Sequence, residues 1–194
     1  MADRLEAALA DIDRANAGDP SRMIRDATER PVALVEGQCA HRWVLALRPD
    51  APEVLQIVAR AHHLRRWEIP RDSYPRTRDG YLAWRTSLYD FHAGAVAEVM
   101  ARAGYAADAI ARAGQLMHKQ GIKVDADAQS YEDAVGLAFI EVRLPSFIEV
   151  VNEDQLMRAL RRTWRKMSAA GRDAALTADL DPRAAEAVRR ALAE

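Results

Sequence analysis

Apolar residues recur at spacings of three and four along most of the chain, which is the pattern of helices with one buried face. The first such stripe consists of Leu5, Ala8, Leu9 and Ile12, and it stops at the breaker in residues 18–20. Similar patterns cover residues 32–48, 53–63, 81–104, 106–121, 130–144 and 152–168, and a shorter one starts at Pro182. We therefore predict an all-α fold, a helical bundle that forms a single domain over residues 1–194.

Two segments carry the signals of a helix start. Residues 50–53 (Asp-Ala-Pro-Glu) combine a capping carboxylate with an early proline, and residues 130–133 (Ser-Tyr-Glu-Asp) are similar to a capping box. Between them, residues 67–80 contain two prolines and a glycine among charged and aromatic side chains, which is too broken a pattern for a helix. Because long ordered loops are usually functional, we expect this loop to contribute to a site.

Composition and charge exclude several classes of protein. With 28 Lys and Arg against 29 Asp and Glu, the net charge of −1 creates no overall field toward nucleic acid or membranes, and we expect neither as a partner. Apolar runs stay well below the roughly 18 residues of a membrane span and the first residues do not form a signal peptide, so we expect a cytoplasmic protein. Cys39 is the single cysteine, which excludes an intrachain disulfide and a cysteine-rich zinc site.

The histidines are the main chemical clue. All five lie in the middle of the chain on predicted helices: His41, His62, His63, His92 and His118. His62, for example, continues the row of Val54 and Val58 at four-residue spacing and should face the core. A buried imidazole must satisfy both ring nitrogens, and neutral imidazole is the commonest metal ligand. Taken singly, each histidine is equally well explained by ordinary hydrogen bonds, but the set predicts a shared divalent metal ion.

The adjacent pair His62 and His63 admits two interpretations. Neighbouring side chains on a helix diverge by about 100°, so the pair can serve two ions, or one as ligand and the other as acid–base catalyst. We assign His63 to proton transfer as well as to the metal. Lys119, beside His118, is the second catalytic candidate.

The order of these histidines resembles the HD superfamily of metal-dependent phosphohydrolases, whose pattern is a histidine, a His-Asp pair, optional further histidines and a final aspartate on a helical bundle. Residues 59–63 (Ala-Arg-Ala-His-His) are similar to the helix that ends in His-Asp, and residues 91–95 (Phe-His-Ala-Gly-Ala) to a histidine-containing segment of some members. The resemblance implies an HD-like core at about 32–144 with a helical extension at 145–194. His63 stands where that superfamily has aspartate, which leaves the number and kind of metal ions open.

Over its whole length the chain more closely resembles an uncharacterised family of this size, DUF4202. Residues 61–67 (Ala-His-His-Leu-Arg-Arg-Trp) and 162–168 (Arg-Thr-Trp-Arg-Lys-Met-Ser) carry this match, which implies no activity. The Lys-Met-Ser triplet also occurs in class I aminoacyl-tRNA synthetases. The partner motif of those enzymes is absent from the sequence, so we interpret the triplet as structural.

The HD resemblance further implies a carboxylate ligand on the helix after Ser130, where Glu132, Asp133 and Glu141 compete. Asp133 has a structural explanation in the first turn of that helix. Glu141 has none, because it interrupts an otherwise apolar run. We favour Glu141 as the ligand and keep Asp133 as the alternative.

The segment between His63 and His92 is the densest basic and aromatic stretch of the chain. Guanidinium groups suit phosphate and aromatic faces suit a ring, although any single arginine here can be an ordinary solvated side chain. We predict a substrate clamp made of Arg65, Arg66, Arg76, Arg78, Tyr81 and Arg85.

These observations predict a metal-dependent phosphohydrolase that acts on a nucleotide or another small phosphorylated or anionic metabolite. The expected cofactor is a divalent transition metal, one of Mn, Fe, Ni, Co or Zn. Two alternatives stay open: an HD-type di-iron oxygenase, and a non-catalytic metabolite-binding module with a decayed metal site. Homodimerisation also stays open.

Overall fold

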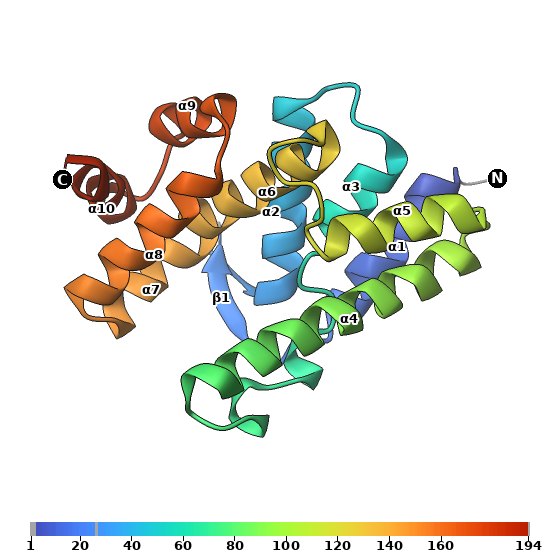
Figure 1. Cartoon of the computed structure of the whole chain (residues 1–194), viewed down its shortest axis with the longest axis horizontal. Coiled ribbons are helices and arrows are strands. Elements are labelled where there is room, and N and C mark those ends of the chain that lie inside the picture. The colour runs from blue at the N-terminus through green and yellow to red at the C-terminus, as the bar shows by residue number, and fades with distance from the viewer. Residues whose placement is uncertain (1–2, 26, 194) are drawn as a thin grey trace.

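Figure 1 shows the computed structural model of the protein, which describes residues 3–25 and 27–193. Helices make up 73% of the chain, so the predicted all-α class is confirmed. The elements are α1 (Arg4–Asn16), β1 (Arg22–Arg25), β2 (Thr28–Pro31), α2 (Val32–Leu47), α3 (Glu53–Arg60), the 3-10 turns η1 (Arg66–Glu68) and η2 (Arg71–Ser73), α4 (Arg78–Arg102), α5 (Ala107–Met117), α6 (Ala126–Ala138), the π-helical turn η3 (Phe139–Arg143), α7 (Leu144–Val150), α8 (Glu153–Lys166), α9 (Ala169–Thr177) and α10 (Pro182–Ala193).

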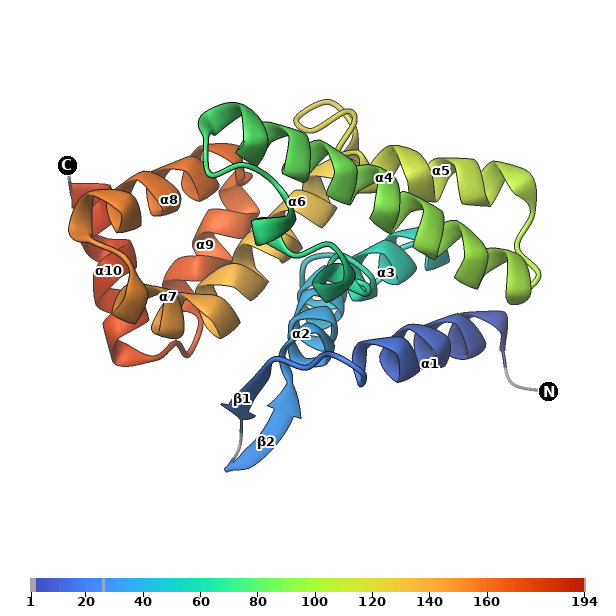
Figure 2. The same ribbon diagram turned by 90° about the horizontal axis from the view of Figure 1, so that it is seen from below.

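A short antiparallel hairpin interrupts the helical pattern. β1 pairs with β2 from Arg22 opposite Pro31 to Arg25 opposite Thr28, and the hairpin projects from the bundle beside the start of α2 (Figure 2). The sequence pattern did not predict it, because four-residue strands rich in charge carry no clear alternation of apolar and polar positions. The short helices α7 and α9 also escaped prediction. None of the helices in the described part of the chain combines the length and apolar character that a membrane span requires.

Two hydrophobic clusters hold the helices together. The larger one joins helices from the first two thirds of the chain around fully buried residues such as Ile12 and Leu55. The smaller one joins the end of α6 to α7, α8, α9 and α10 around Leu144 and Leu160. Figure 2 shows α2 and α6 between these two groups of helices. The groups therefore form the two sides of the molecule, with α2 and α6 in the middle.

Polar caps explain where α6 and α8 begin. Asp125 accepts hydrogen bonds from the backbone N–H groups of residues 127 and 128 at the start of α6, and Asn152 forms a capping box at the start of α8. The predicted helix start at residues 130–133 was wrong, because the cap lies five residues earlier. Asp133 therefore lies in the middle of α6.

A glycine sets the distance between α2 and α3. A Cβ atom at Gly37 would lie 2.3 Å from the carbonyl oxygen of Arg60, the last residue of α3. Only glycine allows the two backbones to come this close. The start of α3 differs from the prediction: Pro52 is its N-cap and no side chain caps it, so Asp50 does not have the capping role expected of it.

Candidate functional site

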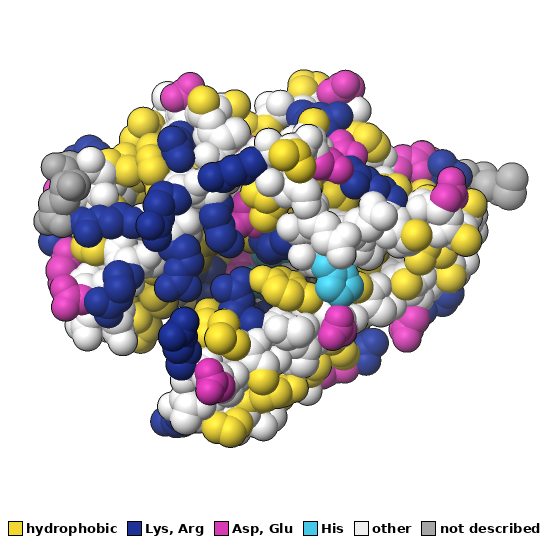
Figure 3. Space-filling model, viewed as in Figure 1, with side chains coloured by type: hydrophobic (Ala, Val, Ile, Leu, Met, Phe, Trp, Pro, Cys, Tyr) yellow, Lys and Arg dark blue, Asp and Glu magenta, His cyan; other side chains and the backbone are white. Residues whose placement is uncertain are grey.

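A large basic cleft opens between the two sides of the molecule. Its volume is about 930 Å³, and its lining comes from α2, the segment after α3, α4, α6, η3 and α8. In Figure 3 the cleft is the hollow near the centre of the view, with Lys and Arg side chains around its rim and acidic groups deeper inside. The arrangement suits a ligand that carries negative charge.

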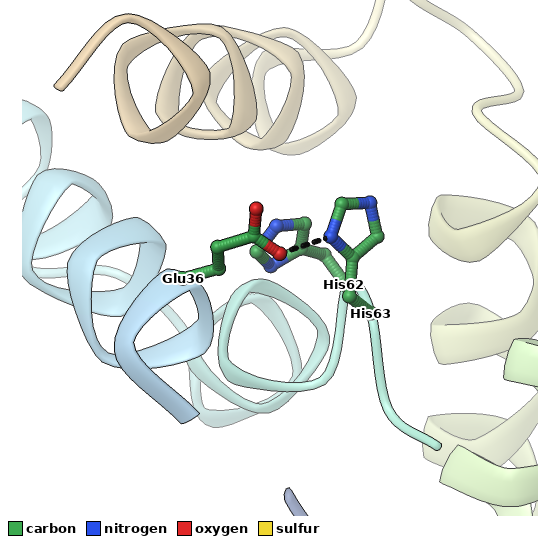
Figure 4. Close-up of side chains that lie close together, drawn as sticks. All are labelled: Glu36, His62 and His63. Carbon is green, nitrogen blue, oxygen red and sulfur yellow. Dashed lines mark hydrogen bonds and ion pairs between the residues drawn. The ribbon is translucent and has the colours of Figure 1, made fainter. Parts of the chain in front are cut away.

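Three side chains deep in this cleft form a group that could hold a metal ion. Glu36 comes from the second turn of α2, and His62 and His63 follow directly after the end of α3. One potential ligand atom from each residue lies within 4.8 Å of the others. Figure 4 shows the two imidazoles and the carboxylate turned toward one another. The close approach at Gly37, one residue after Glu36, brings this carboxylate to the end of α3.

Backbone carbonyl groups orient two of the imidazoles of the cleft. The Nδ1 of His62 lies 3.1 Å from the carbonyl oxygen of Ala59, and the Nδ1 of His92 lies 3.0 Å from that of Leu64. Each Nδ1 must carry the proton and donate it to the carbonyl, which leaves Nε2 with a free lone pair. Ligating histidines in metalloproteins usually have such a partner on their other nitrogen. Both rings are therefore prepared to donate a lone pair to a ligand in the cleft.

Burial controls the charge states in this cluster. Desolvation lowers the pKa of His62 and His63 well below the ordinary value of 6.5, and it lowers the pKa of His92 to about 4. Desolvation also raises the pKa of Glu36, while the charges of Arg143 and Arg66 oppose that shift. The three imidazoles are thus neutral at neutral pH, which is the state that binds a metal ion.

The neutral imidazoles predict a loss of stability in acid. His92 has a pKa of about 4 in the folded chain but about 6.5 when unfolded, so the unfolded chain binds the extra proton first. Its contribution to stability is complete above pH 6.5 and is lost as the pH falls toward 4, at about 1.4 kcal/mol per pH unit. Urea unfolding in the presence of a chelator between pH 7 and pH 4.5 measures this slope. Replacing His92 with Asn should reduce this slope by about 1.4 kcal/mol per pH unit, the contribution of one proton. An unchanged slope would show that His92 does not cause the loss of stability.

Glu36 provides a further sign that a cation fits the cluster. Its Oε2 accepts a hydrogen bond from Nδ1 of His63 at 2.7 Å. Its Oε1 is buried and has no hydrogen bond to any described residue, although Nε of Arg143 lies 3.1 Å away at ion-pair distance. A buried carboxylate oxygen without a hydrogen bond is costly. Two imidazole nitrogens and one carboxylate oxygen are donors that suit zinc, iron, cobalt or manganese better than magnesium or calcium.

One wall of the cleft holds arginines against aromatic rings instead of carboxylates. The guanidinium of Arg66 lies 4.8 Å from the ring centre of Trp84, and that of Arg85 lies 5.6 Å from the ring of Tyr89 and 6.0 Å from that of Tyr81. Arg85 also donates a hydrogen bond to the Tyr89 hydroxyl. Aromatic faces position a guanidinium without cancelling its charge. The predicted clamp residues Arg66, Tyr81 and Arg85 therefore lie in the cleft, where their charge is available to an anion.

On another side of the cleft, Glu132 joins two lysines. It forms an ion pair with Lys119 and a second one with Lys166, whose Nζ lies 2.9 Å from Oε1. Lys119 has a left-handed backbone, with φ of 57°, and its ammonium lies 5.2 Å from the ring centre of Tyr131. Lys119, which we named because it stands beside His118, lines the cleft, whereas His118 does not. The partner of Lys119, Glu132, was named from the sequence only as a competing metal ligand.

Two of the histidines expected at the metal lie elsewhere. His41 comes five residues after Glu36 on α2, about 140° around the helix, and its ring nitrogens lie 3.1 Å from the Gln56 amide oxygen and 3.3 Å from Arg60. His118 ends α5 and pairs with Asp90 at 2.9 Å near the surface. The expectation that all five histidines converge is therefore wrong for His41 and His118. His92 lines the same cleft, with its ring centre 6.3 Å from that of His63.

Both predicted carboxylate ligands have other roles. Glu141 lies in the π-helical turn η3 and accepts hydrogen bonds from Arg25, Arg42 and the Trp43 indole. These contacts hold its carboxylate outside the cleft, away from the histidines. Asp133 accepts the backbone N–H of Ser168 at 2.8 Å and its hydroxyl at 2.6 Å. It ties α6 to the start of α9.

The Lys-Met-Ser triplet has the structural role expected of it. Lys166 pairs with Glu132, Met167 is buried, and Ser168 caps α9.

Three members of the predicted clamp do not line the cleft. Arg65 pairs with Glu68, and Arg76 pairs with Asp72 on the surface. Arg78 is exposed in the first turn of α4. The loop contains two 3-10 turns, at Arg66–Glu68 and Arg71–Ser73, and it does not direct all its arginines inward.

Glu36 is the residue that sequence reasoning missed. It is 4% exposed, within an otherwise apolar turn of α2 that contains Val32, Ala33 and Val35. A carboxylate at such a position is rarely buried unless it has partners, and this was the available signal. The same argument was applied to Glu141, where the partners proved to be arginines and an indole.

A protein-family model described as a domain of unknown function, DUF4202, matches residues 6–188. The chain belongs to the DUF4202 family. The match extends over most of both hydrophobic clusters and over every residue of the cleft named above. No curated protein matches this DUF4202 chain, and no solved structure matches it.

Proposed function

We propose that the chain is a metal-dependent phosphohydrolase that acts on a nucleotide or another small phosphorylated or anionic metabolite. One observation carries this proposal: a buried carboxylate and two neutral imidazoles lie together inside a cleft whose wall holds uncompensated arginines. A metal site and an anion site in the same cavity are the two components that hydrolysis of a phosphate ester needs.

Glu36, His62 and His63 would hold the ion, with His62 donating through Nε2 because its Nδ1 bonds to Ala59. When bound, the ion supplies Lewis acidity toward a phosphoryl oxygen and lowers the pKa of a water molecule. Arg143 lies at ion-pair distance from Glu36. It would help to neutralise the carboxylate and the incoming phosphate at the same end of the cleft.

Other side chains of the cleft would bind the substrate and move protons. Arg66 and Arg85 would hold the phosphate oxygens, because guanidinium groups present several donors in one plane. The free Nε2 of His92 would accept a proton from the attacking water, since its low pKa keeps it unprotonated. The side chains of Trp84 and Tyr81 would exclude bulk water from this wall.

We further propose that the resemblance to the HD superfamily reflects a common arrangement of ligands. A first ligand on one helix and a pair at the end of the next helix is the order that the resemblance implies. Glu36 would take the place that we had assigned to His41, five residues further along α2. This makes the ligand set of the chain different from the pattern of a histidine followed by His-Asp.

A non-catalytic metabolite-binding module is the second candidate. The carboxylate of Glu36 already has a hydrogen bond from His63 and an ion pair with Arg143, so the cluster has partners without a metal. Such a module would bind an anionic ligand in the cleft and would be insensitive to chelators. The two candidates therefore differ in their response to metal removal.

Metal analysis of protein purified without added metal, followed by a screen of phosphorylated metabolites with Mn, Fe, Co, Ni and Zn, tests the proposal. We expect about one bound ion per chain and hydrolysis that stops when a chelator is added. Near-stoichiometric iron without phosphatase activity would favour the oxygenase. Ligand binding without any metal would favour the non-catalytic module.

Metal binding should also stabilise the fold. A ligand that binds only the native state at one hundred times its Kd adds about 2.7 kcal/mol to the free energy of unfolding. For a chain of 194 residues this raises Tm by roughly 5–10 °C. Thermal unfolding of the metal-free protein, with and without each metal, measures the shift. The Glu36→Gln variant is the control, and an equal shift in that variant would show that the metal binds elsewhere.

A further inference from the structure

Helix α8 has three faces, and each has a different composition. At about 100° per residue, Leu156, Met157 and Leu160 point into the smaller hydrophobic cluster. Ala159, Thr163 and Lys166 line the cleft. After Asp154 in the first turn, the remaining face carries four arginines: Arg158, Arg161, Arg162 and Arg165. Their spacing of three and four residues makes them one continuous row.

Most of this row has no acidic partner. Arg158, Arg162 and Arg165 are exposed and form no hydrogen bond or ion pair with any other residue that the structure describes. On the opposite side of the molecule, by contrast, exposed arginines such as Arg4 and Arg14 pair with carboxylates. The row therefore keeps three charges that are free to meet a ligand.

The arginine row borders a second groove that continues from the cleft. This groove has a volume of about 340 Å³ and lies between α8 and the end of α10, with Trp164 in its lining. Arg162 lines both the groove and the cleft, so the two cavities meet at this residue. Figure 3 shows the Lys and Arg side chains continuing from the rim of the hollow across the surface over α8. The net charge of −1 conceals this uneven distribution.

We propose that the α8 row and the cleft form one track for single-stranded nucleic acid, with the phosphate backbone along the arginines and its end in the cleft. That the bound strand is the substrate rests on the proposed function; the binding itself does not. Guanidinium groups next to aromatic side chains favour a strand over an acidic peptide, because they pair with phosphates while rings stack on bases. Trp164 lies in the groove, and Trp67, Tyr81 and Phe147 line the cleft.

Fluorescence anisotropy with a labelled 12-nucleotide strand, as RNA and as DNA, tests the proposal on the full chain in the presence of a chelator. We expect binding that weakens with salt. The triple variant Arg158→Ala/Arg162→Ala/Arg165→Ala should bind the strand at least tenfold more weakly. Its slope of log K against log salt should be smaller in magnitude by about 2, because each of the three lost phosphate contacts contributes about 0.7. The triple variant Arg4→Ala/Arg14→Ala/Arg102→Ala loses the same charge on the far side and should bind within twofold of the wild type.

Three results would overturn the proposal: no binding at low salt, equal losses in the two triple variants, or equally effective competition by polyglutamate, which would indicate an acidic protein partner. The binding test and the proposed function can fail separately, because the strand is bound without metal. Binding that depends on α8, without hydrolysis of the strand or of any small phosphorylated metabolite when metal is added, would support the track and contradict the phosphohydrolase. Metal-dependent hydrolysis of mononucleotides without strand binding would support the phosphohydrolase and contradict the track.

Discussion

Replacing His62 with Ala is expected to lower metal affinity and phosphohydrolase activity together by at least 100-fold. Even residues that only orient a metal ligand change affinity by about 10–100-fold, and His62 would itself be a ligand. Its Nδ1 donates a hydrogen bond to the carbonyl oxygen of Ala59, so Nε2 is the nitrogen left to bind the ion. Metal content by mass spectrometry and turnover with added metal measure the two effects.

The other histidines of the chain provide matched controls. His41 bonds to Gln56 and Arg60, and His118 bonds to Asp90, both outside the cluster. The variants His41→Ala and His118→Ala should keep their metal and most of their activity. If His41→Ala lost the metal as completely as His62→Ala, the proposed ligand set would be wrong.

A conservative change at Glu36 separates the effect on metal binding from the effect on folding. Glu36→Gln keeps the size of the side chain but removes the negative charge, so the variant should fold and bind metal at least 100-fold more weakly. Its thermal unfolding without metal should be close to that of the wild type or higher, because a buried charge is removed. Retention of full metal content in Glu36→Gln would contradict the role of this carboxylate.

Replacing Gly37 with Ala is expected to destabilise the fold by about 3 kcal/mol, at the upper end of the usual range for overpacking. The new methyl group would lie 2.3 Å from the carbonyl oxygen of Arg60. A backbone atom cannot move aside as a flexible side chain can, so α2 and α3 must separate. That movement would also carry Glu36 away from His62 and His63, and the variant should lose metal affinity. Urea unfolding and metal titration measure the two losses.

Gly94 offers a control for this substitution. It lies within α4, and a Cβ atom there would meet nothing within 4 Å. Gly94→Ala should therefore stabilise the protein by about 0.5–1 kcal/mol, as expected for glycine replaced by alanine in an unobstructed helix. If both variants changed stability by the same amount, the close approach of α2 and α3 would not be the cause.

Local signals in the sequence determined the fold class and most of the helices. Spacings of three and four residues predicted α1, α2, α4, α5 and α8, because these helices are long enough for the pattern to repeat. The breaker at residues 18–20 was also identified correctly as non-helical. The predicted loop at 67–80 was correct only in part, because it contains two 3-10 turns and α4 already begins at Arg78. The hairpin and the short helices α7 and α9 could not be found, since four to nine residues contain too few repeats of either pattern.

The site was only partly accessible from the sequence. His62, His63, His92, Arg66, Tyr81, Arg85 and Lys119 were named as site residues, and the structure places them in one cleft. The spacing of residues shows which side chains share the buried face of a helix. It does not show which other helix that face packs against. His41 and Glu36 both lie on α2, and only the packing of α2 against α3 decided that the carboxylate meets the histidines.

The same distinction holds for charge. The sequence determined how many charged residues the chain has and that they nearly cancel. It did not determine that Glu141 would be held by Arg25, Arg42 and Trp43, or that the arginines of α8 would face a groove open to solvent. Those outcomes depend on contacts between residues far apart in the chain, which only the tertiary structure brings together.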